Sequence, residues 1–484
     1  MKTKLLLLSF VLLTSVGHSR NSPEVIRHDS VGAIVNDLEK FIPEYIQKQN
    51  IPGVSIALVN DNNIVWADGF GFVNSVTKER VNMNTLFEVA SISKVVTAYI
   101  ALRLVDEGKL SLDKPLLSYL SEEWMPYSVY QDSLKLNKVL SHSSGLRKTT
   151  REIMFKPGSA YYYSANGFNL VKDVMEEVTG ENLEELAQRL VFQPLEMKNS
   201  SFARNDKLLP VTANGHLHAT VPIVIFGILF LVQYLFITLI GALIIRVSTK
   251  SWKLKPVHKI IFIILSVIIT TGILFLILGP DSLNEFAYIT LFTGLITLAL
   301  FLIIFNTVRM IILKIGLKRV YQRIIIISCG LLLGGIIILI STRVVNLPVP
   351  KWPNYEPGPA GTLRTSPTEL AFFMIEIANP RHLKTETAEL LRTPQIKLDE
   401  NLSWGMGPGI FYSQKGYALW QWGQHIDFQS IMIIYPESKS GVVVCTNNDL
   451  LNPDVALEIA QRALGENLET VRSAIHLNYD YSTK

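Results

Sequence analysis

Ser91 and Lys94 are the residues whose types and spacing point most directly to chemistry. Two residues separate them, and they follow the strand-like run Leu86 to Ala90 at the start of an apolar helical pattern. A three-residue spacing in a helix puts the hydroxyl and the amine on one face, within reach of each other. A serine hydroxyl is a weak nucleophile near neutral pH, and a desolvated lysine can take its proton. The pair therefore indicates nucleophilic catalysis by Ser91.

Sequence context separates this pair from two others with the same spacing. The Ser75–Lys78 pair lies in a polar turn, and the Ser111–Lys114 pair lies in a loop. Only Ser91 opens a predicted helix, which runs from Val95 through Val105. Free N–H groups and the dipole at a helix start favour a developing oxyanion.

Strands and helices that would position the pair are predicted in two separate parts of the chain. Alternating apolar residues, turn residues and helical periodicity identify them. The predicted strands are Ile51 to Val59, Ile64 to Ala67, Tyr417 to Trp422, Ser430 to Tyr435 and Gly441 to Thr446, and a final helix runs from about Pro453 to Leu464.

The region between these two parts has the composition of a membrane domain. The 484 residues are 49% hydrophobic, and the mean hydropathy is +0.29. Four nearly continuous apolar runs without a charged residue are long enough to span a bilayer. They are Val221 to Ile245, Ile260 to Leu278, Phe286 to Val308 and Ile324 to Ile340. Transport usually needs charge within the membrane, so we interpret the spans as an anchor, with a lipid-contacting or signalling role left open.

Charges in the loops predict the orientation of these spans. Residues 246–259 and 309–323 each carry five Lys or Arg and no acid, which places them in the cytoplasm. Residues 1–19 resemble a secretory signal, or alternatively an uncleaved anchor. Both features predict a multi-pass protein of the cell membrane with its remaining domain on the periplasmic or extracellular side, in contact with membrane lipid.

The sequence gives little support for a nucleic-acid-binding site, a disulfide or a metal site. Outside the two basic loops the chain is mildly acidic, so nucleic-acid binding is not expected. Cys329 and Cys445 are not expected to pair. No metal-ligand spacing occurs, and His216 and His218, beside the first span, are interpreted as interfacial.

Five stretches of the chain resemble landmarks of one family when they are taken together. They are Thr85 to Lys94, Leu140 to Leu146, Phe192 to Met197, Ala360 to Ser366 and Gly441 to Asn447. The family is the serine beta-lactamase and penicillin-binding-protein superfamily, specifically its class C-like branch of esterases, D-aminopeptidases and related peptidases. The resemblance implies an α+β fold, with a five-stranded antiparallel sheet flanked by helices and a helical lobe. A membrane bundle would interrupt this fold. The predicted organisation is signal peptide 1–19, first part 24–218, spans 219–346, second part 347–465 and tail 466–484.

The resemblance also implies the roles of individual residues. Ser91 would be acylated, Lys94 would activate it, and Tyr163 would shuttle protons as a phenol held partly ionised by nearby donors. The backbone N–H groups of Ser91 and Gln424 would form an oxyanion hole, and no cofactor is implied.

Two positions depart from the family pattern. Ala165 stands where the Y-x-N motif has asparagine, and Asn166 follows it as a possible replacement. The third motif reads Gln421-Trp422-Gly423, so its first side chain can hydrogen-bond but carries no charge. This weakens the expectation of a true lactamase. Two interpretations of nearby His425 stay open: it supplies the missing charge, or it is a loop histidine without a catalytic task. His142 is interpreted as a structural turn.

The predicted function is a membrane-anchored serine hydrolase acting on an ester, amide or peptide outside the cytoplasm. Its partner would be a small-molecule or peptide substrate, with cell-wall fragments among the candidates. The alternatives are a catalytically weak penicillin-binding-like sensor or binding module, and a transport or signalling protein with an accessory outer domain.

Overall fold

The computed structural model describes residues 30–218, 346–353, 356–448 and 454–480. The predicted signal peptide and the four predicted spans between Val221 and Ile340 lie outside these residues. Among the described residues, no helix combines the length and apolar character needed to cross a membrane.

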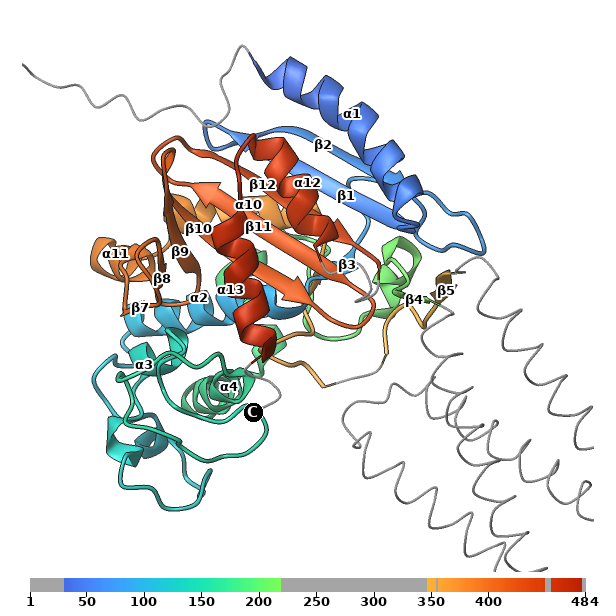
Figure 1. Cartoon of the computed structure of the whole chain (residues 1–484). Coiled ribbons are helices and arrows are strands. Elements are labelled where there is room, and N and C mark those ends of the chain that lie inside the picture. The colour runs from blue at the N-terminus through green and yellow to red at the C-terminus, as the bar shows by residue number, and fades with distance from the viewer. Residues whose placement is uncertain (1–29, 219–345, 354–355, 449–453, 481–484) are drawn as a thin grey trace, which may run out of the picture.

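An eight-stranded antiparallel sheet forms the centre of the fold, with the strand order β2-β1-β12-β11-β10-β9-β8-β7 (Figure 1). The five long strands form one side of this order, and all five were predicted. Their bounds are β1 Gly53–Asn60, β2 Asn63–Gly71, β10 Gly416–Gln424, β11 Gln429–Tyr435 and β12 Ser440–Thr446.

The prediction of a five-stranded sheet was wrong, because three short strands extend the sheet beyond β10. These are β7 Ile396–Lys397, β8 Leu402–Trp404 and β9 Gly409–Ser413. They are two to five residues long, too short for a period-two pattern to identify them. Successive antiparallel pairing onto the edge of β10 makes them strands.

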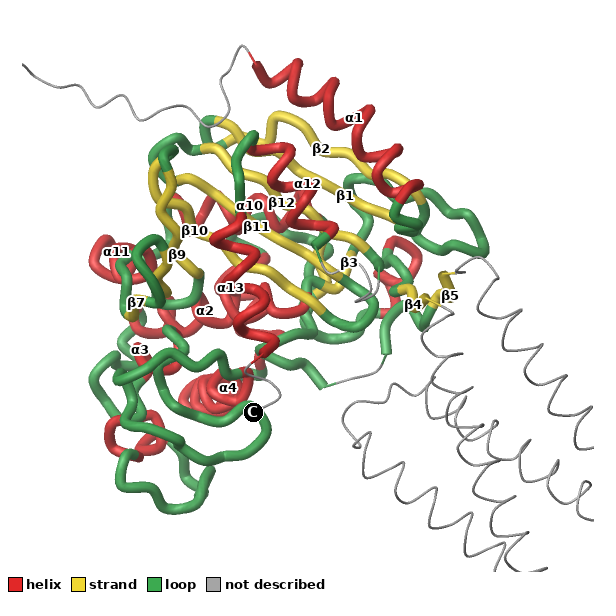
Figure 2. Tube along the Cα trace, viewed as in Figure 1, coloured by secondary structure: helices red, strands yellow, loops and turns green. Residues whose placement is uncertain are grey.

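The two faces of the sheet bury two separate cores. In β1, Ala57 and Val59 face one core, and Ile56 and Leu58 face the other. This alternation follows from the two-residue repeat of a strand. The second core is covered by α1, α12 and α13, and the first by α10 and α2 (Figures 1 and 2). The bounds are α1 Val31–Lys48, α2 Ser93–Asp106, α10 Pro367–Ala378, α11 Thr385–Arg392, α12 Val455–Leu464 and α13 Glu469–Asp480.

A helical lobe packs against α2 on the side away from the sheet (Figure 1). Its α-helices are α3 Leu136–Leu140, α4 Ala165–Thr179 and α5 Leu183–Ala187. The side chain of Ser164 caps α4 by accepting the N–H of Gly167, and Gly180, with φ +72°, ends the helix. The predicted lobe is therefore present beside the predicted sheet.

Two short strands bring the ends of the undescribed internal segment together. β4 (His216–His218) pairs antiparallel with β5 (Asn346–Pro348), and His218 lies opposite Asn346. His216 was predicted to be interfacial, and this was wrong. Its ring is fully buried, with Nε2 accepting the N–H of Ser75 and Nδ1 3.1 Å from the carbonyl oxygen of Asn447.

Candidate active site

A short turn between the sheet and the lobe carries Ser91. β3 (Phe87–Glu88), which pairs with β6 (Arg364–Thr365), leads into the 3₁₀ turn η2 (Ala90–Ile92), and α2 begins at Ser93. The helix therefore starts two residues earlier than predicted. Ala90 has φ +44°, a left-handed conformation that costs a residue with a Cβ about 1–2 kcal/mol. The backbone strain lies directly before the predicted nucleophile, as is common at active sites.

Lys94 contacts Ser91 directly. Its Nζ donates to Ser91 Oγ at 2.9 Å and to the carbonyl oxygen of Ala360, also at 2.9 Å. The side chain is buried and lacks a carboxylate among these contacts. Burial, with a smaller contribution from the positive charge of Lys148, lowers the pKa of Lys94 to about 7. A large fraction of this amine is therefore neutral near pH 7 and can accept the Ser91 proton.

Tyr163 completes a hydrogen-bonded group with Ser91. Its phenol hydrogen-bonds Ser91, and its oxygen accepts the Nε2 of Gln421 at 3.1 Å. The prediction of a partly ionised phenol was wrong. Burial raises the pKa of Tyr163 despite both hydrogen bonds. Lys94 Nζ lies over the face of the ring, 5.0 Å from its centroid. A neutral phenol can relay a proton to a leaving group.

Gly423 allows β10 to approach the nucleophile turn. A Cβ built at this position would lie 2.0 Å from the carbonyl oxygen of Val89 and 2.5 Å from Ser430 Oγ. Ser430 Oγ also donates to that carbonyl oxygen at 2.9 Å. Gln424, whose backbone N–H is a predicted oxyanion donor, is the last residue of β10. The strand that contains it is therefore held against the residues immediately before Ser91.

Asn166 does not replace the missing asparagine of the Y-x-N motif. Its amide donates to the carbonyl oxygen of Thr150 at 2.8 Å. Ala165, at the motif position itself, is the first residue of α4. Besides Ser91, Lys94 donates to the backbone carbonyl oxygen of Ala360. Sequence reasoning missed Ala360 because it acts through its backbone and is 266 positions away in the chain.

A family model and two solved structures agree with this architecture. The model described as Beta-lactamase matches residues 38–224. The octameric penicillin-binding protein homologue from Pyrococcus abyssi has a TM-score of 0.56 at 18% identity, covering 90% of this chain and 78% of its own. The D-amino acid amidase from Ochrobactrum anthropi SV3 has a TM-score of 0.55 at 14% identity, covering 91% and 99%.

This chain has the beta-lactamase and penicillin-binding-protein fold.

Two relatives are similar in sequence over part of the chain. Protein flp of Staphylococcus aureus strain N315 is 25% identical over 210 residues, covering 39% of this chain and 42% of its own length. An uncharacterized protein of Alkalihalophilus pseudofirmus is 27% identical over 164 residues, covering 33% and 47%. The chain therefore matches less than half the length of these relatives.

Within this beta-lactamase fold, His142 positions Tyr163. The buried His142 ring lies 4.2 Å from the Tyr163 ring, centroid to centroid, and its Nδ1 accepts the N–H of Ser164 at 3.2 Å. Burial, together with the charges of Lys94 and Lys148, lowers the pKa of His142 well below 6.5 and keeps its ring neutral. His142 thus orients the tyrosine loop and is more than a turn residue.

The two other Ser-x-x-Lys pairs have no comparable arrangement. Lys78 Nζ lies over the ring of Phe72, and Lys114 Nζ lies over the ring of Tyr119. Within the described part of the beta-lactamase fold, no cluster of three His, Cys, Asp or Glu residues could hold a metal ion.

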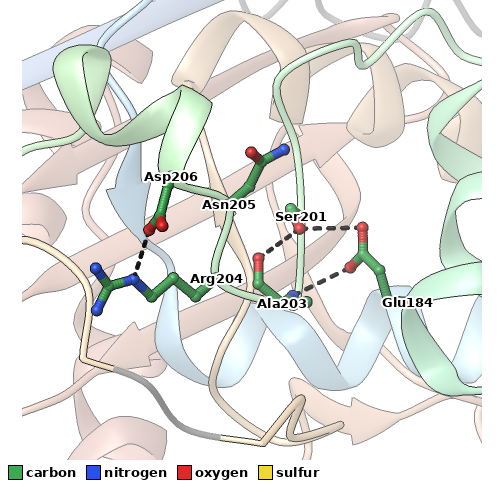
Figure 3. Close-up of a pocket in the computed structure, with 6 residues that line it drawn as sticks. All are labelled: Glu184, Ser201, Ala203, Arg204, Asn205 and Asp206. Carbon is green, nitrogen blue, oxygen red and sulfur yellow. Dashed lines mark hydrogen bonds and ion pairs between the residues drawn. The ribbon is translucent and has the colours of Figure 1, made fainter.

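A surface hollow of about 470 Å³ has none of these residues in its lining (Figure 3). It is lined by Glu184, Ser201, Ala203, Arg204, Asn205 and Asp206. Glu184 already accepts Ser201 Oγ and the N–H of Ala203, and Arg204 pairs with Asp206. These charged groups thus already have partners within the protein, and we assign no function to this hollow.

Proposed function

We propose that this protein is a serine hydrolase that forms an acyl-enzyme through Ser91 and acts on an ester, amide or peptide. One observation carries the proposal: the 2.9 Å contact between Ser91 Oγ and Lys94 Nζ, in which the lysine is buried. The neutral amine would remove the hydroxyl proton as Oγ attacks the substrate carbonyl carbon.

The remaining steps use the groups around this pair. The N–H groups of Ser91 and Gln424 would stabilise the tetrahedral oxyanion. When the intermediate collapses, the bond from carbon to the leaving group breaks, and the proton held by Lys94 would return to that group while the Tyr163 phenol donates a hydrogen bond to it. Water would then add to the acyl-enzyme with the same residues acting as base, which releases the acid and restores Ser91.

The descriptions of the two similar solved structures suggest classes of substrate. One structural relative is described as a D-amino acid amidase and another as a penicillin-binding protein homologue. Gln421 is uncharged and donates to Tyr163, so this position supplies no charge for a substrate carboxylate. Cell-wall fragments remain candidate substrates because of the predicted exterior location.

Covalent labelling tests the nucleophile. Membranes containing the protein would be treated separately with a fluorophosphonate probe and a fluorescent penicillin, and labelling would be measured by gel and intact mass. We expect fluorophosphonate labelling of the wild type and its loss in Ser91→Ala. Ser111→Ala is the matched control, because Ser111 has the same spacing to a lysine but lies on an exposed loop. Equal labelling of wild type and Ser91→Ala would contradict the assignment.

A second candidate function is a penicillin-binding-like sensor, and the commitment of Asn166 to Thr150 favours it. Without an asparagine on Lys94, deacylation could be slow while the pocket still binds ligand. A penicillin adduct on Ser91 that persists without turnover would support this candidate. Rapid hydrolysis of a simple ester would exclude it.

We also propose that the four apolar runs anchor the domain in the cell membrane with the active site outside the cytoplasm. The basic loops and the signal-like N-terminus support this orientation. The pairing of β4 with β5 supports an insertion that starts and ends at one point of the domain.

Removing the insertion is expected to leave an active, soluble domain. His218 and Asn346 are paired across β4 and β5, so a two-residue Asn-Gly link in place of residues 219–345 would close an ordinary hairpin. We expect esterase activity within about twofold of the full chain, measured in the soluble fraction with the shortened Ser91→Ala chain as control. An insoluble or inactive product would show that the insertion is part of the domain.

A further inference from the structure

His425 lies at the end of the strand that contains the third family motif. It follows β10 directly, and its N–H donates to the carbonyl oxygen of Phe428 at 2.9 Å, which extends the β10–β11 hairpin. Alternate residues of a strand share a face, so His425 continues the face of Gln421 and Gly423. Gln421 is 1% exposed, whereas the side chain of His425 is 42% exposed. Of these two side chains, His425 is the one a ligand can reach.

The ring of His425 lies beside the group that contacts Lys94. A Cβ built at Gly361 would be 3.0 Å from both Nε2 and Cε1 of His425. Gly361 follows Ala360, whose carbonyl oxygen accepts Lys94 Nζ. Any side chain at position 361 would press on the ring. The imidazole is thus held next to the predicted nucleophile pair.

Glu88 favours the protonated form of the imidazole, and Arg364 holds Glu88 in place. Glu88 Oε1 contacts His425 Nδ1, and Glu88 Oε2 accepts Nη2 of Arg364 at 2.5 Å. Arg364 is buried between the rings of Trp352 and Phe428. Burial alone would lower the pKa of His425, but the charge and hydrogen bond of Glu88 outweigh it and raise that pKa. Burial alone would raise the pKa of Glu88, and the charges of Arg364 and His425 lower it.

The carboxylate of Glu88 is shared between two basic side chains in the region around His425. The groups that face it are Glu88 on β3, Arg364 on β6, Asp427 in the β10–β11 turn and Lys94 on α2. Burial and then the charge of Glu88 raise the pKa of Asp427 to about 7, so this carboxyl is partly protonated near neutral pH. The carboxylate of Glu88 serves both Arg364 and His425, and Lys94 donates to Ser91 and Ala360 rather than to a carboxylate. Basic side chains that share one carboxylate in a desolvated region favour an anionic ligand.

We propose that His425 is the specificity-determining residue that binds a carboxylate of the substrate, replacing the charge that Gln421 lacks. The substrate class is therefore an anionic ester or amide, with its carboxylate close enough to the scissile carbonyl to reach the end of β10. This proposal rests on the proposed serine hydrolase function.

Three chromogenic esters test it and distinguish the position of the carboxylate. They are neutral 4-nitrophenyl acetate, 3-carboxy-4-nitrophenyl acetate with the charge on the leaving group, and 4-nitrophenyl hydrogen glutarate with the charge on the acyl group. In His425→Gln we expect kcat/KM to fall about 10- to 100-fold for at least one anionic ester, the range for losing one charge-assisted hydrogen bond. The neutral ester should change less than about twofold.

His382→Gln is the matched control. His382 also pairs with a glutamate, Glu376, at 3.3 Å, and its side chain is 36% exposed, but it lies outside the site. This variant should leave all three esters unchanged. His425→Lys should restore the preference for the anionic ester.

The pH dependence provides a readout that a purely structural role would not change. The titration of Lys94 changes kcat/KM equally for the anionic and the neutral ester. It therefore cancels in the ratio of the two kcat/KM values. Because the imidazolium exists below its pKa, this ratio should be high at low pH and fall as the pH rises past that pKa. In His425→Lys the fall should disappear.

An equal loss for all three esters, or no loss for any, would overturn the role of His425. Failure of the underlying function would look different, since hydrolysis of the neutral ester would then survive in Ser91→Ala. Equilibrium binding of 4-nitrophenyl hydrogen glutarate and 3-carboxy-4-nitrophenyl acetate to Ser91→Ala tests the carboxylate site without turnover. Adding His425→Gln should weaken the binding of at least one of them by the same 10- to 100-fold, and unchanged binding of both would contradict the proposal.

Discussion

Replacing Lys94 by methionine is expected to lower the rate of Ser91 acylation by about 10²- to 10⁴-fold, the usual contribution of a general base. Methionine keeps a long apolar side chain in a buried position, so the helix and its packing should persist. The variant removes both hydrogen bonds of the amine, to Ser91 and to Ala360. Stopped-flow acylation with 4-nitrophenyl acetate measures the effect, and Lys114→Met, from the exposed Ser111–Lys114 pair, is the control.

The same reaction should follow the titration of Lys94. Because the pKa of this amine is lowered to about 7, its neutral form increases as the pH rises through 7, and acylation should increase and then level off. The charge of Lys148 contributes to that lowering, so Lys148→Met should move the midpoint to higher pH. A profile centred near the ordinary lysine pKa, or a midpoint insensitive to Lys148, would show that Lys94 is not the base.

Gly423→Ala should have the second large effect, through geometry alone. The added methyl group would lie 2.0 Å from the carbonyl oxygen of Val89, so β10 or the Ser91 turn must move. A shift of about 1 Å in a catalytic group costs on the order of 10²-fold in rate. Overpacking of this kind also destabilises a fold by about 1–3 kcal/mol.

Two measurements separate the parts of this prediction. Urea unfolding gives the change in stability, and kcat/KM for 4-nitrophenyl acetate gives the change in catalysis. Gly32→Ala is the control, since a Cβ at Gly32 in α1 meets no atom within 4 Å. It should leave kcat/KM unchanged and, because alanine favours a helix, raise the stability by no more than about 1 kcal/mol. Wild-type activity in Gly423→Ala would contradict the close approach of β10 to the nucleophile turn.

Local sequence was sufficient for the elements with strong periodicity. The five long strands, α12 and the helix after Ser91 were predicted within a few residues, because alternation and helical spacing act over short distances. The prediction that residues 466–484 form a tail after the final helix was wrong, because α13 lies there and packs its apolar side chains on the second core. The three short strands β7 to β9 were missed, since pairing with a neighbour creates them. The spans between Val221 and Ile340 stay a prediction from composition.

The contacts and ionisation states of the site residues depended more on the fold than the secondary structure did. The spacing of Ser91 and Lys94 is local, so their contact could be predicted from a helical turn. Whether Tyr163 is ionised depends on burial, and the sequence alone suggested the wrong state. By its position in the sequence, Asn166 is a plausible substitute for the asparagine missing from the Y-x-N motif. However, α4 begins at Ala165, and the side-chain amide of Asn166 donates to the carbonyl oxygen of Thr150.

By itself the sequence determined the contact between Ser91 and Lys94, the long elements and the stretches that resemble the family, because each of these depends on neighbouring residues. Only the tertiary structure decided what surrounds the pair. It placed the Ala360 carbonyl on Lys94, Gly423 against Val89, and Glu88 between Arg364 and His425. Burial and charge then determine the pKa values of Lys94, Tyr163 and His425, since both depend on residues that are distant in the chain and meet only when it folds.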